Sequence, residues 1–485
     1  MRHAIGLGVV LLLVATGEGL AAGNVGPPCV SVSWVRTGNM TTPREGHAAT
    51  LLPSGKVLVA GAGADGPATA ELYDPATGTW SATGSMSIPR VFHTMTLLPT
   101  GKVLAVGGEV LTLEPQAAEL YDPDTGQWTK TGAMLLARRL HTATLLPTGK
   151  VLVVGGDGGF GALDPTHTAE LYDPATGEWH PTGALSTGRT LHTATLLASG
   201  QVLVLGGFVR GGAPSASAEL YDPATGTWTP VAPMLASRFE NTATRLSSGA
   251  LLVAGGNVGA ADAELYDPAA STWRRTGSML ALRFLHTATS LPSGKVLVVD
   301  GTTGNTVLAN TELFDPESET WSDAGCTVTP RRGHTATFLP SGAVLVAGGS
   351  GDSSAELYGI LVSPAQVNLA PGASQTFTAE GGSGLGYVWS FVHNESGGTL
   401  TASGDYQAGP LGGVSDVLKV MDSFANSSTA TVNVLRQAAA VSSTAPQAKS
   451  MGCGTTRGAA LPSVGGAVLL LLGWRSLRVR RRPTP

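Results

Sequence analysis

One arrangement of apolar and polar positions returns along most of the chain, every 45 to 51 residues. Each copy holds two apolar runs such as HTATLL and KVLVVGG, then AELYDP, then a fourth stretch that follows a tryptophan. All four runs have the length and the β-branched or aromatic composition of strands, and turn-forming residues separate them. Each copy is therefore expected to form four β-strands.

The copies are counted by one polar residue that opens the first apolar run. This anchor is a histidine in all copies but one, where it is an asparagine: His47, His93, His141, His192, Asn241, His286 and His334. Self-similarity at a fixed period is the signature of a repeat architecture in which each unit packs against its neighbours. Seven anchors predict seven units.

Both ends of the repeated region fall within a unit. The region begins with SWVRTGNM, which belongs to the end of a unit, and it stops at Tyr358, before a tryptophan strand. We expect the inner strands of residues 344–358 to be completed by outer strands from residues 33–52. Such a junction would close a ring and remove its free sheet edges.

Four sequence features recur at fixed positions of the unit: a double glycine, an acidic residue before Leu-Tyr or Leu-Phe, a tryptophan, and an arginine before the anchor. The tryptophans are Trp34, Trp80, Trp128, Trp179, Trp228, Trp273 and Trp321. Two units depart from the double glycine, since Ala62 follows Gly61 and Asp300 precedes Gly301. These features resemble the kelch repeat over residues 30–358. The resemblance implies an all-β fold with a seven-bladed β-propeller.

The arginine and the glutamate of this pattern occur in every unit. The arginines are Arg44, Arg90, Arg138, Arg189, Arg238, Arg283 and Arg331, and the glutamates are Glu71, Glu119, Glu170, Glu219, Glu264, Glu312 and Glu356. A ring of such charges around a channel could hold a carbohydrate or an anion. We favour a structural role as buried charge pairs between strands, because a catalytic site needs one constellation rather than seven copies.

The anchor histidines pose the same choice between chemistry and structure. One histidine per unit at a strand start is expected to hydrogen-bond the backbone rather than to bind a metal. Asn241 supports this interpretation, since an amide replaces imidazole in hydrogen bonds but rarely as a transition-metal ligand. We expect no metal and no cofactor.

Charge and motifs narrow the function classes. The net charge is −5 and 13% of the residues are charged, so the sequence offers no broad basic field for nucleic acid. GxSxG, HExxH and P-loop motifs are absent from the sequence. Kelch propellers include copper radical oxidases that resemble galactose oxidase, in which tyrosine, histidine and a cysteine joined to tyrosine hold the metal. Here Cys29 precedes the first strand and Cys326 follows Trp321, so the cysteines do not match that arrangement. We expect a protein that is not an enzyme.

The segments after the double glycine differ from unit to unit, whereas the LPSGK and DPATG loops are nearly uniform. Binding residues concentrate on loops that a rigid scaffold holds in place. We therefore take these loops as candidate ligand-binding sites, against the alternative of unconstrained loop drift. The candidate residues are Phe160, Asp164, His167, Phe208 and Arg210.

The pattern changes after the repeats. Residues 359–435 hold short alternating strands with Gly and Pro turns, which suggest a small β-sandwich. They resemble the bacterial immunoglobulin-like modules of surface proteins, with Trp389 as the expected core residue. Residues 436–452, rich in Ala, Ser and Gln, are expected to form a flexible linker.

Both ends of the chain indicate export. Residues 1–22 combine a charged start, an apolar stretch and small residues, as a secretory signal peptide does. An oxidising compartment permits a disulfide between Cys29 and Cys326. Residues 453–485 combine a cysteine, a short apolar span and an arginine cluster, which resemble the myxobacterial C-terminal surface-sorting tail. By that resemblance Cys453 marks processing or attachment to the envelope membrane.

These features predict a non-enzymatic binding or adhesion protein, located at the cell surface or outside the cell, that recognises an extracellular protein or glycan through its propeller loops. A secreted carbohydrate-active or oxidase-like enzyme on a kelch scaffold is the first alternative, with Asp157, Asp164 and His167 as its modest candidates. A structural envelope component without a discrete ligand is the second.

Overall fold

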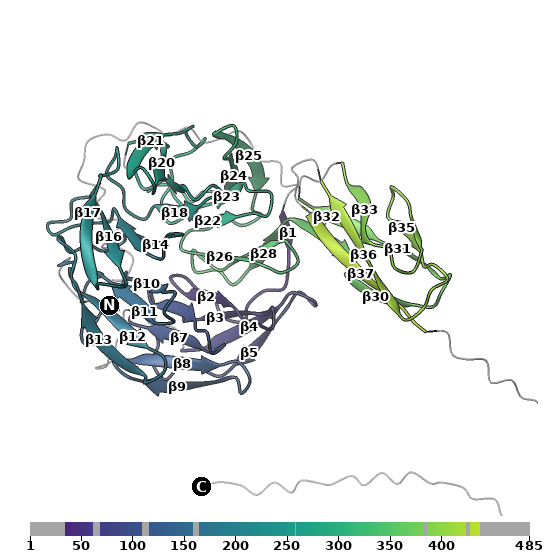
Figure 1. Cartoon of the computed structure of the whole chain (residues 1–485), viewed down its shortest axis with the longest axis horizontal. Coiled ribbons are helices and arrows are strands. Elements are labelled where there is room, and N and C mark those ends of the chain that lie inside the picture. The colour runs from purple at the N-terminus through teal and green to yellow at the C-terminus, as the bar shows by residue number, and fades with distance from the viewer. Residues whose placement is uncertain are drawn as a thin grey trace, which may run out of the picture. The chain divides into compact units, whose positions relative to one another are not determined.

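The computed structural model describes residues 34–61, 68–108, 116–158, 164–257, 259–382, 386–422 and 427–436. Every regular element in these ranges is a β-strand, and no helix occurs among them (Figure 1). The predicted signal peptide, the predicted tail, and the predicted linker apart from Arg436 lie outside these ranges, as do Cys29, Phe160 and Cys453. No helix in the described residues is long and apolar enough to cross a membrane.

Six four-stranded antiparallel sheets follow one another along the chain, each with its strands in sequence order. Sheet 1 contains β2 (Ala48–Leu51), β3 (Val57–Ala60), β4 (Ala70–Asp74) and β5 (Thr79–Thr83). Sheet 2 contains β6 (Thr94–Leu97), β7 (Val103–Val106), β8 (Ala118–Asp122) and β9 (Gln127–Thr131). Sheet 3 contains β10 (Thr142–Leu145), β11 (Val151–Val154), β12 (Ala169–Asp173) and β13 (Glu178–Thr182).

The next three sheets repeat this arrangement. Sheet 4 contains β14 (Thr193–Leu196), β15 (Val202–Leu205), β16 (Ala218–Asp222) and β17 (Thr227–Val231). Sheet 5 contains β18 (Thr242–Arg245), β19 (Leu251–Ala254), β20 (Ala263–Asp267) and β21 (Thr272–Arg275). Sheet 6 contains β22 (Thr287–Ser290), β23 (Val296–Val299), β24 (Asn310–Asp315) and β25 (Thr320–Cys326).

Sheet 7 joins the two ends of the repeated region. Its order is β1 (Trp34–Arg36), β28 (Ala355–Tyr358), β27 (Val344–Ala347) and β26 (Thr335–Phe338). The predicted junction is confirmed in that β1 pairs with β28, placing Trp34 opposite Tyr358. The predicted range of 33–52 was too long, because residues 48–51 form the first strand of sheet 1 instead of an outer strand of sheet 7.

The first strands of the sheets meet in a closed series. Each of β2, β6, β10, β14, β18 and β22 contacts the next, β22 contacts β26, and β26 contacts β2 (Figure 1). The second strand of every sheet is buried along its whole length. A strand that is covered on both faces needs apolar residues at every position instead of alternate ones, which explains runs such as VLVV. The core therefore consists of layers between neighbouring sheets.

The second glycine of each pair is required by close backbone approach. Gly156 has φ +86°, and a Cβ atom there would lie 2.6 Å from the carbonyl oxygen of Arg139. The segment that enters sheet 3 therefore packs directly on the turn after β11. Any other residue would push these two segments apart.

Outer side chains tie each sheet to the preceding one. In sheet 2, the indole Nε1 of Trp128 donates to the carbonyl oxygen of Gly84, 2.9 Å away, and the Tyr121 hydroxyl lies 2.8 Å from the Thr83 hydroxyl. The same tyrosine packs against Trp128 with ring centroids 5.1 Å apart. The recurrent tyrosines and tryptophans thus serve the packing of neighbouring sheets.

Residues 360–434 form further sheets around a separate apolar cluster. The strands are β29 (Ile360–Ser363), β30 (Gln366–Leu369), β31 (Ser374–Thr376), β32 (Thr378–Gly381), β33 (Val388–His393), β34 (Thr399–Leu400), β35 (Asp405–Gln407), β36 (Val414–Met421) and β37 (Ser427–Val434). They pair as β30-β37-β36-β33, β31-β35-β34 and β29-β32. Trp389 is half-buried at this cluster, with its ring 6.2 Å from that of Phe377.

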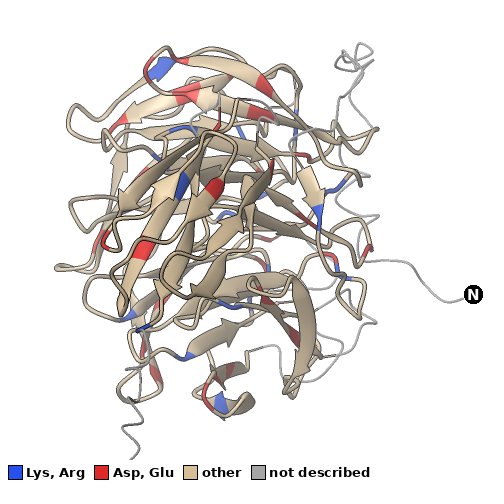
Figure 2. Cartoon of the chain, turned by 90° about the vertical axis from the view of Figure 1, so that its right-hand side faces the viewer, with Lys and Arg blue, Asp and Glu red and all other residues tan. Residues whose placement is uncertain are grey.

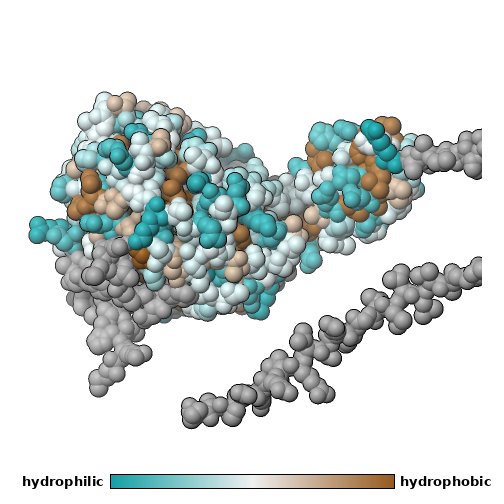
Figure 3. All heavy atoms as spheres, turned by 90° about the horizontal axis from the view of Figure 1, so that it is seen from below, coloured by the Kyte–Doolittle hydropathy of each residue, from teal (hydrophilic) through white to brown (hydrophobic). Residues whose placement is uncertain are grey.

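Charged residues are sparse on the described surface. In Figure 2 the blue and red segments are scattered singly along the ribbon, without a broad area of one sign. In Figure 3 apolar and hydrophilic side chains are likewise interspersed over the propeller sheets. Function is therefore sought in local arrangements of residues, above all where the repeat is broken.

Candidate functional site

A ring of residues lies where the chain enters the first strand of each sheet. Its members all have positive φ, between 50° and 68°: Gly46, Phe92, Leu140, Leu191, Glu240, Leu285 and Gly333. Backbone hydrogen bonds link consecutive members in the described residues, except between Glu240 and Leu285. The N–H of Leu191, for example, donates to the carbonyl oxygen of Leu140 at 3.2 Å, and that of Glu240 donates to the carbonyl oxygen of Leu191 at 3.0 Å. We call this set the entry ring.

The anchor residues form a second ring, one position further along the chain. At five junctions between sheets the imidazole Nε2 hydrogen-bonds the threonine hydroxyl that begins the preceding sheet, at 2.9 to 3.1 Å. Thr142 with His192 is one example. The histidines therefore connect neighbouring sheets through side chains. The backbone hydrogen bonds that sequence reasoning expected also act on His47, His141, His192 and His286.

Burial, reinforced by nearby arginines, keeps these imidazoles neutral. It lowers the pKa of His141, His192 and His286 to about 3. The pKa of His93 and His334 is also lowered well below its ordinary value, chiefly by burial. At neutral pH the anchor ring thus carries hydrogen-bonding groups but no positive charge.

Two junctions break the anchor pattern. At the junction of sheets 1 and 2, Ala48 stands in the threonine position, and His93 Nε2 has no hydrogen-bond partner in the described residues. At the junction of sheets 4 and 5, Asn241 stands in the histidine position. Neither the Asn241 amide nor the Thr193 hydroxyl has a partner among the described residues, although Asn241 is only 5% exposed.

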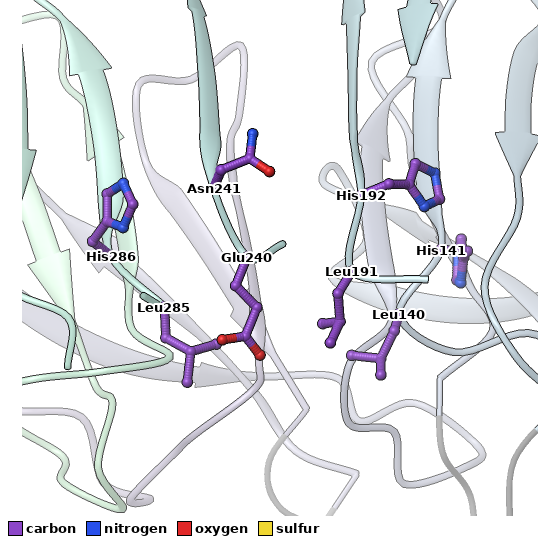
Figure 4. Close-up of a pocket in the computed structure, with 8 residues that line it drawn as sticks. All are labelled: Leu140, His141, Leu191, His192, Glu240, Asn241, Leu285 and His286. Atoms are coloured by element: carbon purple, nitrogen blue, oxygen red, sulfur yellow. The ribbon is translucent and has the colours of Figure 1, made fainter. Parts of the chain in front are cut away.

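A cavity of about 250 Å³ lies at the second of these breaks. Its lining has two layers (Figure 4): Leu140, Leu191, Glu240 and Leu285 from the entry ring, and His141, His192, Asn241 and His286 from the anchor ring. Figure 4 shows Asn241 and Glu240 between the neighbouring His192–Leu191 and His286–Leu285 pairs. The cavity is therefore lined by Asn241 and by its chain neighbour Glu240.

Glu240 is the single acidic member of the entry ring, all of whose positions are described. Burial raises the pKa of its carboxyl group to about 7, and the positive charge of Arg332 opposes this effect. Arg332 itself lies beside Glu45, with its Nε 3.5 Å from a carboxylate oxygen. The carboxyl group of Glu240 therefore gains or loses its proton near neutral pH.

The recurrent arginines and glutamates form an ion pair within every sheet. The Arg Nη2–Glu Oε1 distances are 2.9 Å for Arg44–Glu71, 3.2 Å for Arg90–Glu119, 2.8 Å for Arg138–Glu170, 3.0 Å for Arg189–Glu219, and 2.8 Å for both Arg238–Glu264 and Arg331–Glu356; Arg283 pairs with Glu312. All fourteen side chains are buried.

Each buried charge of these pairs is hydrogen-bonded on several sides. Arg138, for example, donates to the carbonyl oxygens of Gly155 and Thr168, and Glu170 also accepts from the backbone N–H groups of Leu135 and Leu136. The Nη groups of these arginines are engaged in this way in every sheet, whereas Nε is hydrogen-bonded only in Arg138 and Arg238 and has no partner in the described residues in the other five arginines. Their structural role stays a prediction, which the variants below test.

The candidate loop residues are divided between surface and core. Asp164 and Arg210, from loops of sheets 3 and 4, form an exposed ion pair of 3.5 Å. His167 is exposed. Phe208 is 7% exposed and stacks on Phe239, with ring centroids 4.1 Å apart, so it belongs to a buried aromatic cluster. Phe160 lies outside the described residues.

The three candidates of the enzymatic alternative do not converge. Asp157 is fully buried and lies 2.7 Å from Arg139, whereas Asp164 and His167 are exposed. Among the described residues, no group of three or more His, Cys, Asp or Glu side chains could hold a metal ion. Cys326 is disulfide-bonded, and because both other cysteines lie outside the described ranges, the Cys29–Cys326 pairing stays a prediction.

Sequence reasoning missed Glu240. Its signal was available in the repeat, because the residue before the anchor is Gly, Phe or Leu in every other unit. Asn241 was noticed, but only as evidence against metal binding. Only the folded ring shows that Glu240 and Asn241 line the same cavity.

Comparisons with known proteins agree with this architecture. The kelch motif model matches residues 138–185 and 190–235. A fungal alcohol oxidase of the AA5 family, solved in complex with copper, superimposes with a TM-score of 0.57 at 16% identity, over 85% of this chain and 100% of its own. A structure of YjhT gives a TM-score of 0.48 at 16% identity, over 59% of this chain and 98% of its own. No curated protein matches the sequence.

The fold and the rings of recurrent residues define a repeat protein of the β-propeller class. More particularly, residues 138–185 and 190–235 carry kelch motifs, and the repeated four-stranded sheets are consistent with a kelch β-propeller.

Proposed function

We propose that this protein is a non-enzymatic binding or adhesion protein that recognises an extracellular protein or carbohydrate with one face of its propeller. Kelch repeats suggest a propeller for protein binding. The proposal includes seven blades, here sheets 1 to 7, and an immunoglobulin-like module at residues 359–435. It also includes export by the signal peptide of residues 1–22 and display at the cell surface through the tail of residues 453–485.

One observation carries the proposal: the recurrent polar groups are fixed in buried pairs, whereas the groups that differ between blades gather at one end. The loop after the second strand of a blade and the segment that enters the blade lie side by side. Bridges such as Thr190–Phe208 and Arg139–Asp157 join them. The exposed Asp164–Arg210 pair and the cavity at Glu240 both belong to these segments.

An oxidase-like enzyme is the second candidate, because a fungal alcohol oxidase shares the fold. The cavity residues do not fit a copper centre. His141, His192 and His286 each use Nε2 for a threonine hydroxyl, and neither tyrosine nor cysteine lines the cavity. The described residues therefore favour binding over oxidation. A structural envelope component without a ligand is the third candidate.

The test exposes the purified full chain to arrays of glycans and extracellular matrix proteins, and records both retention and turnover. We expect retention without product, and loss of retention when Asp164 and Arg210 are both replaced by Ala. The Lys56→Ala variant, on a uniform LPSGK loop, serves as the control. Product formation would establish the enzymatic alternative, and failure to retain any array component would favour the structural one.

A further inference from the structure

The junction between sheets 4 and 5 contains buried polar groups without partners. An asparagine amide is shorter than an imidazole, and the hydrogen bond that Thr142 makes with His192 has no counterpart between Thr193 and Asn241. A buried polar group left without a partner costs about 1–3 kcal/mol. Native proteins keep few such groups, and each calls for an explanation. A bound ligand that supplies the missing partners is such an explanation.

A second substitution lies directly beside the first. Glu240 places a carboxyl group in the entry ring among Leu140, Leu191 and Leu285. A carboxylate that is partly buried among leucines is unfavourable, and the positive charge of Arg332 only partly offsets this effect, since the pKa of Glu240 is still raised to about 7. Glu240 and Asn241 are consecutive and both line the cavity, Glu240 in its leucine layer and Asn241 in its histidine layer, so a ligand that spans the two layers can reach both of them (Figure 4).

We propose that the cavity formed by Glu240, Asn241 and the surrounding leucines binds a primary ammonium group on a short, unbranched aliphatic stem. Such a group occurs in simple alkylamines and in lysine side chains. The proposal goes beyond recognition by the loops, since it assigns a separate small-ligand site on the propeller axis.

The size of the cavity limits the ligand to one such group. A volume of about 250 Å³ is below the range of about 300–1,000 Å³ usual for drug-sized ligands. An oligosaccharide would not fit, and its hydroxyl groups would find no partners on the leucine side. An aliphatic stem suits the leucines, while the carboxylate and the amide oxygen accept hydrogen bonds from the ammonium N–H groups.

The charges around the cavity also favour a cation over an anion. His141, His192 and His286 are neutral because burial lowers their pKa to about 3. The positive charge that acts on Glu240 is Arg332, which lies beside the carboxylate of Glu45. A bound cation would favour the ionised form of Glu240 and lower its raised pKa. Binding should therefore release a proton near pH 7 and strengthen from pH 6 to pH 8.

The experiment measures n-butylamine binding to the purified full chain by titration calorimetry at pH 6, 7 and 8, with n-butanol as the neutral control ligand. A second arm uses N-acetyl-lysine methylamide, which presents the same group as a protein would. We expect the amine to bind, the alcohol to bind about tenfold more weakly or less, and the amine affinity to rise with pH. Binding of n-butylamine alone would identify a free alkylamine as the ligand. Binding of both compounds would show that a lysine side chain of a protein also fits.

The variants restore residues found elsewhere in the repeat, so that loss of binding does not result from misfolding. Glu240→Leu and Asn241→His should each weaken amine binding by about tenfold or more, since a hydrogen bond to a charged group is worth about 1.5–3 kcal/mol. Glu317→Gln, which neutralises an exposed acid in the turn between β24 and β25, should bind like the parent. Thermal unfolding of each variant reports its folding directly.

The proposal is overturned if neither amine binds, if n-butanol binds as tightly as n-butylamine, or if Glu240→Leu retains full affinity. Its failure is distinguishable from that of the proposed function. Retention on the arrays depends on the exposed loops, whereas amine binding depends on the axis, so either can be lost while the other persists.

Discussion

The junction between sheets 3 and 4 and the junction between sheets 4 and 5 have the same backbone and different chemistry. In the first, Thr142 and His192 hydrogen-bond at 2.9 Å. In the second, Thr193 faces a blade that carries Asn241, and the polar groups of both residues are buried without partners in the described chain. Because the same kind of junction recurs around the ring, each departure from its pattern is informative. The regular junctions show which hydrogen bond stabilises neighbouring sheets, and the junction of sheets 4 and 5 lacks that hydrogen bond.

The largest expected effect is acid unfolding driven by the regular junctions. The anchor histidines are neutral in the folded protein, since burial lowers the pKa of His47, His141, His192 and His286 to about 3. Their stabilising contribution is present above pH 6.5 and is lost as the pH falls, because the unfolded chain takes up the protons first. At pH 5 each costs roughly 2 kcal/mol.

Summed over the ring, this loss is comparable to the total stability of about 5–15 kcal/mol of a typical domain. Denaturant unfolding at pH 7, 6 and 5 measures it. Asn241→His adds one more buried imidazole and should increase the acid sensitivity. A midpoint that did not move between pH 7 and pH 5 would contradict the assignment of a neutral, buried ring.

Breaking one recurrent ion pair should have the next largest effect. Glu170→Ala leaves Arg138 buried without its counter-charge, and Arg189→Ala does the same to Glu219. Each should lower the free energy of unfolding by about 3–5 kcal/mol. Urea unfolding checks this, with exposed Glu317→Ala as the control. Parental stability together with lost ligand binding would show that these charges serve recognition.

A matched pair of substitutions tests the two junctions directly. Thr142→Val removes the partner of His192 and should cost about 1–2 kcal/mol. Thr193→Val removes a hydroxyl that has no partner in the described chain, and should change the stability by less than about 0.5 kcal/mol. Equal losses in the two variants would mean that Thr193 is hydrogen-bonded after all.

The last expected effect is the pH dependence of stability at Glu240. Burial raises the pKa of its carboxyl group to about 7, so the stability that the protonated form contributes is complete below about pH 4.5 and is lost as the pH rises through 7. Glu240→Leu should therefore exceed the parent by about 3 kcal/mol at pH 8 and by only about 1 kcal/mol at pH 5. Unfolding at both pH values measures this difference. A constant difference would place the carboxylate in open solvent.

Much of the propeller is predictable because the same kinds of strand and turn residues recur from unit to unit. Strand-length apolar runs, the tryptophans and the double glycines indicated four strands per unit, and the interrupted units at both ends predicted that β1 would pair with β28. The exact use of residues 33–52 was less predictable. Apolar patterning marks strands, but it does not say to which neighbouring sheet a strand will pair.

The candidate site was harder to predict. Loop variability pointed to Phe208, yet stacking with Phe239 buries this ring. Asp164 and Arg210 are 46 positions apart in the numbering and come together only because sheets 3 and 4 are neighbours. Glu240 seemed an ordinary polar variation until the entry ring showed it among leucines.

The sequence by itself determined the repeat, its strands, the arginines and glutamates that recur in every unit, and the histidines that recur in all units but one, because periodicity is visible along a single chain. Only the tertiary structure decided which groups meet: each anchor with the threonine of the preceding sheet, and Glu240 and Asn241 with one cavity. The physical reason is that hydrogen bonds and burial depend on distances between sheets, and closure of the ring sets those distances.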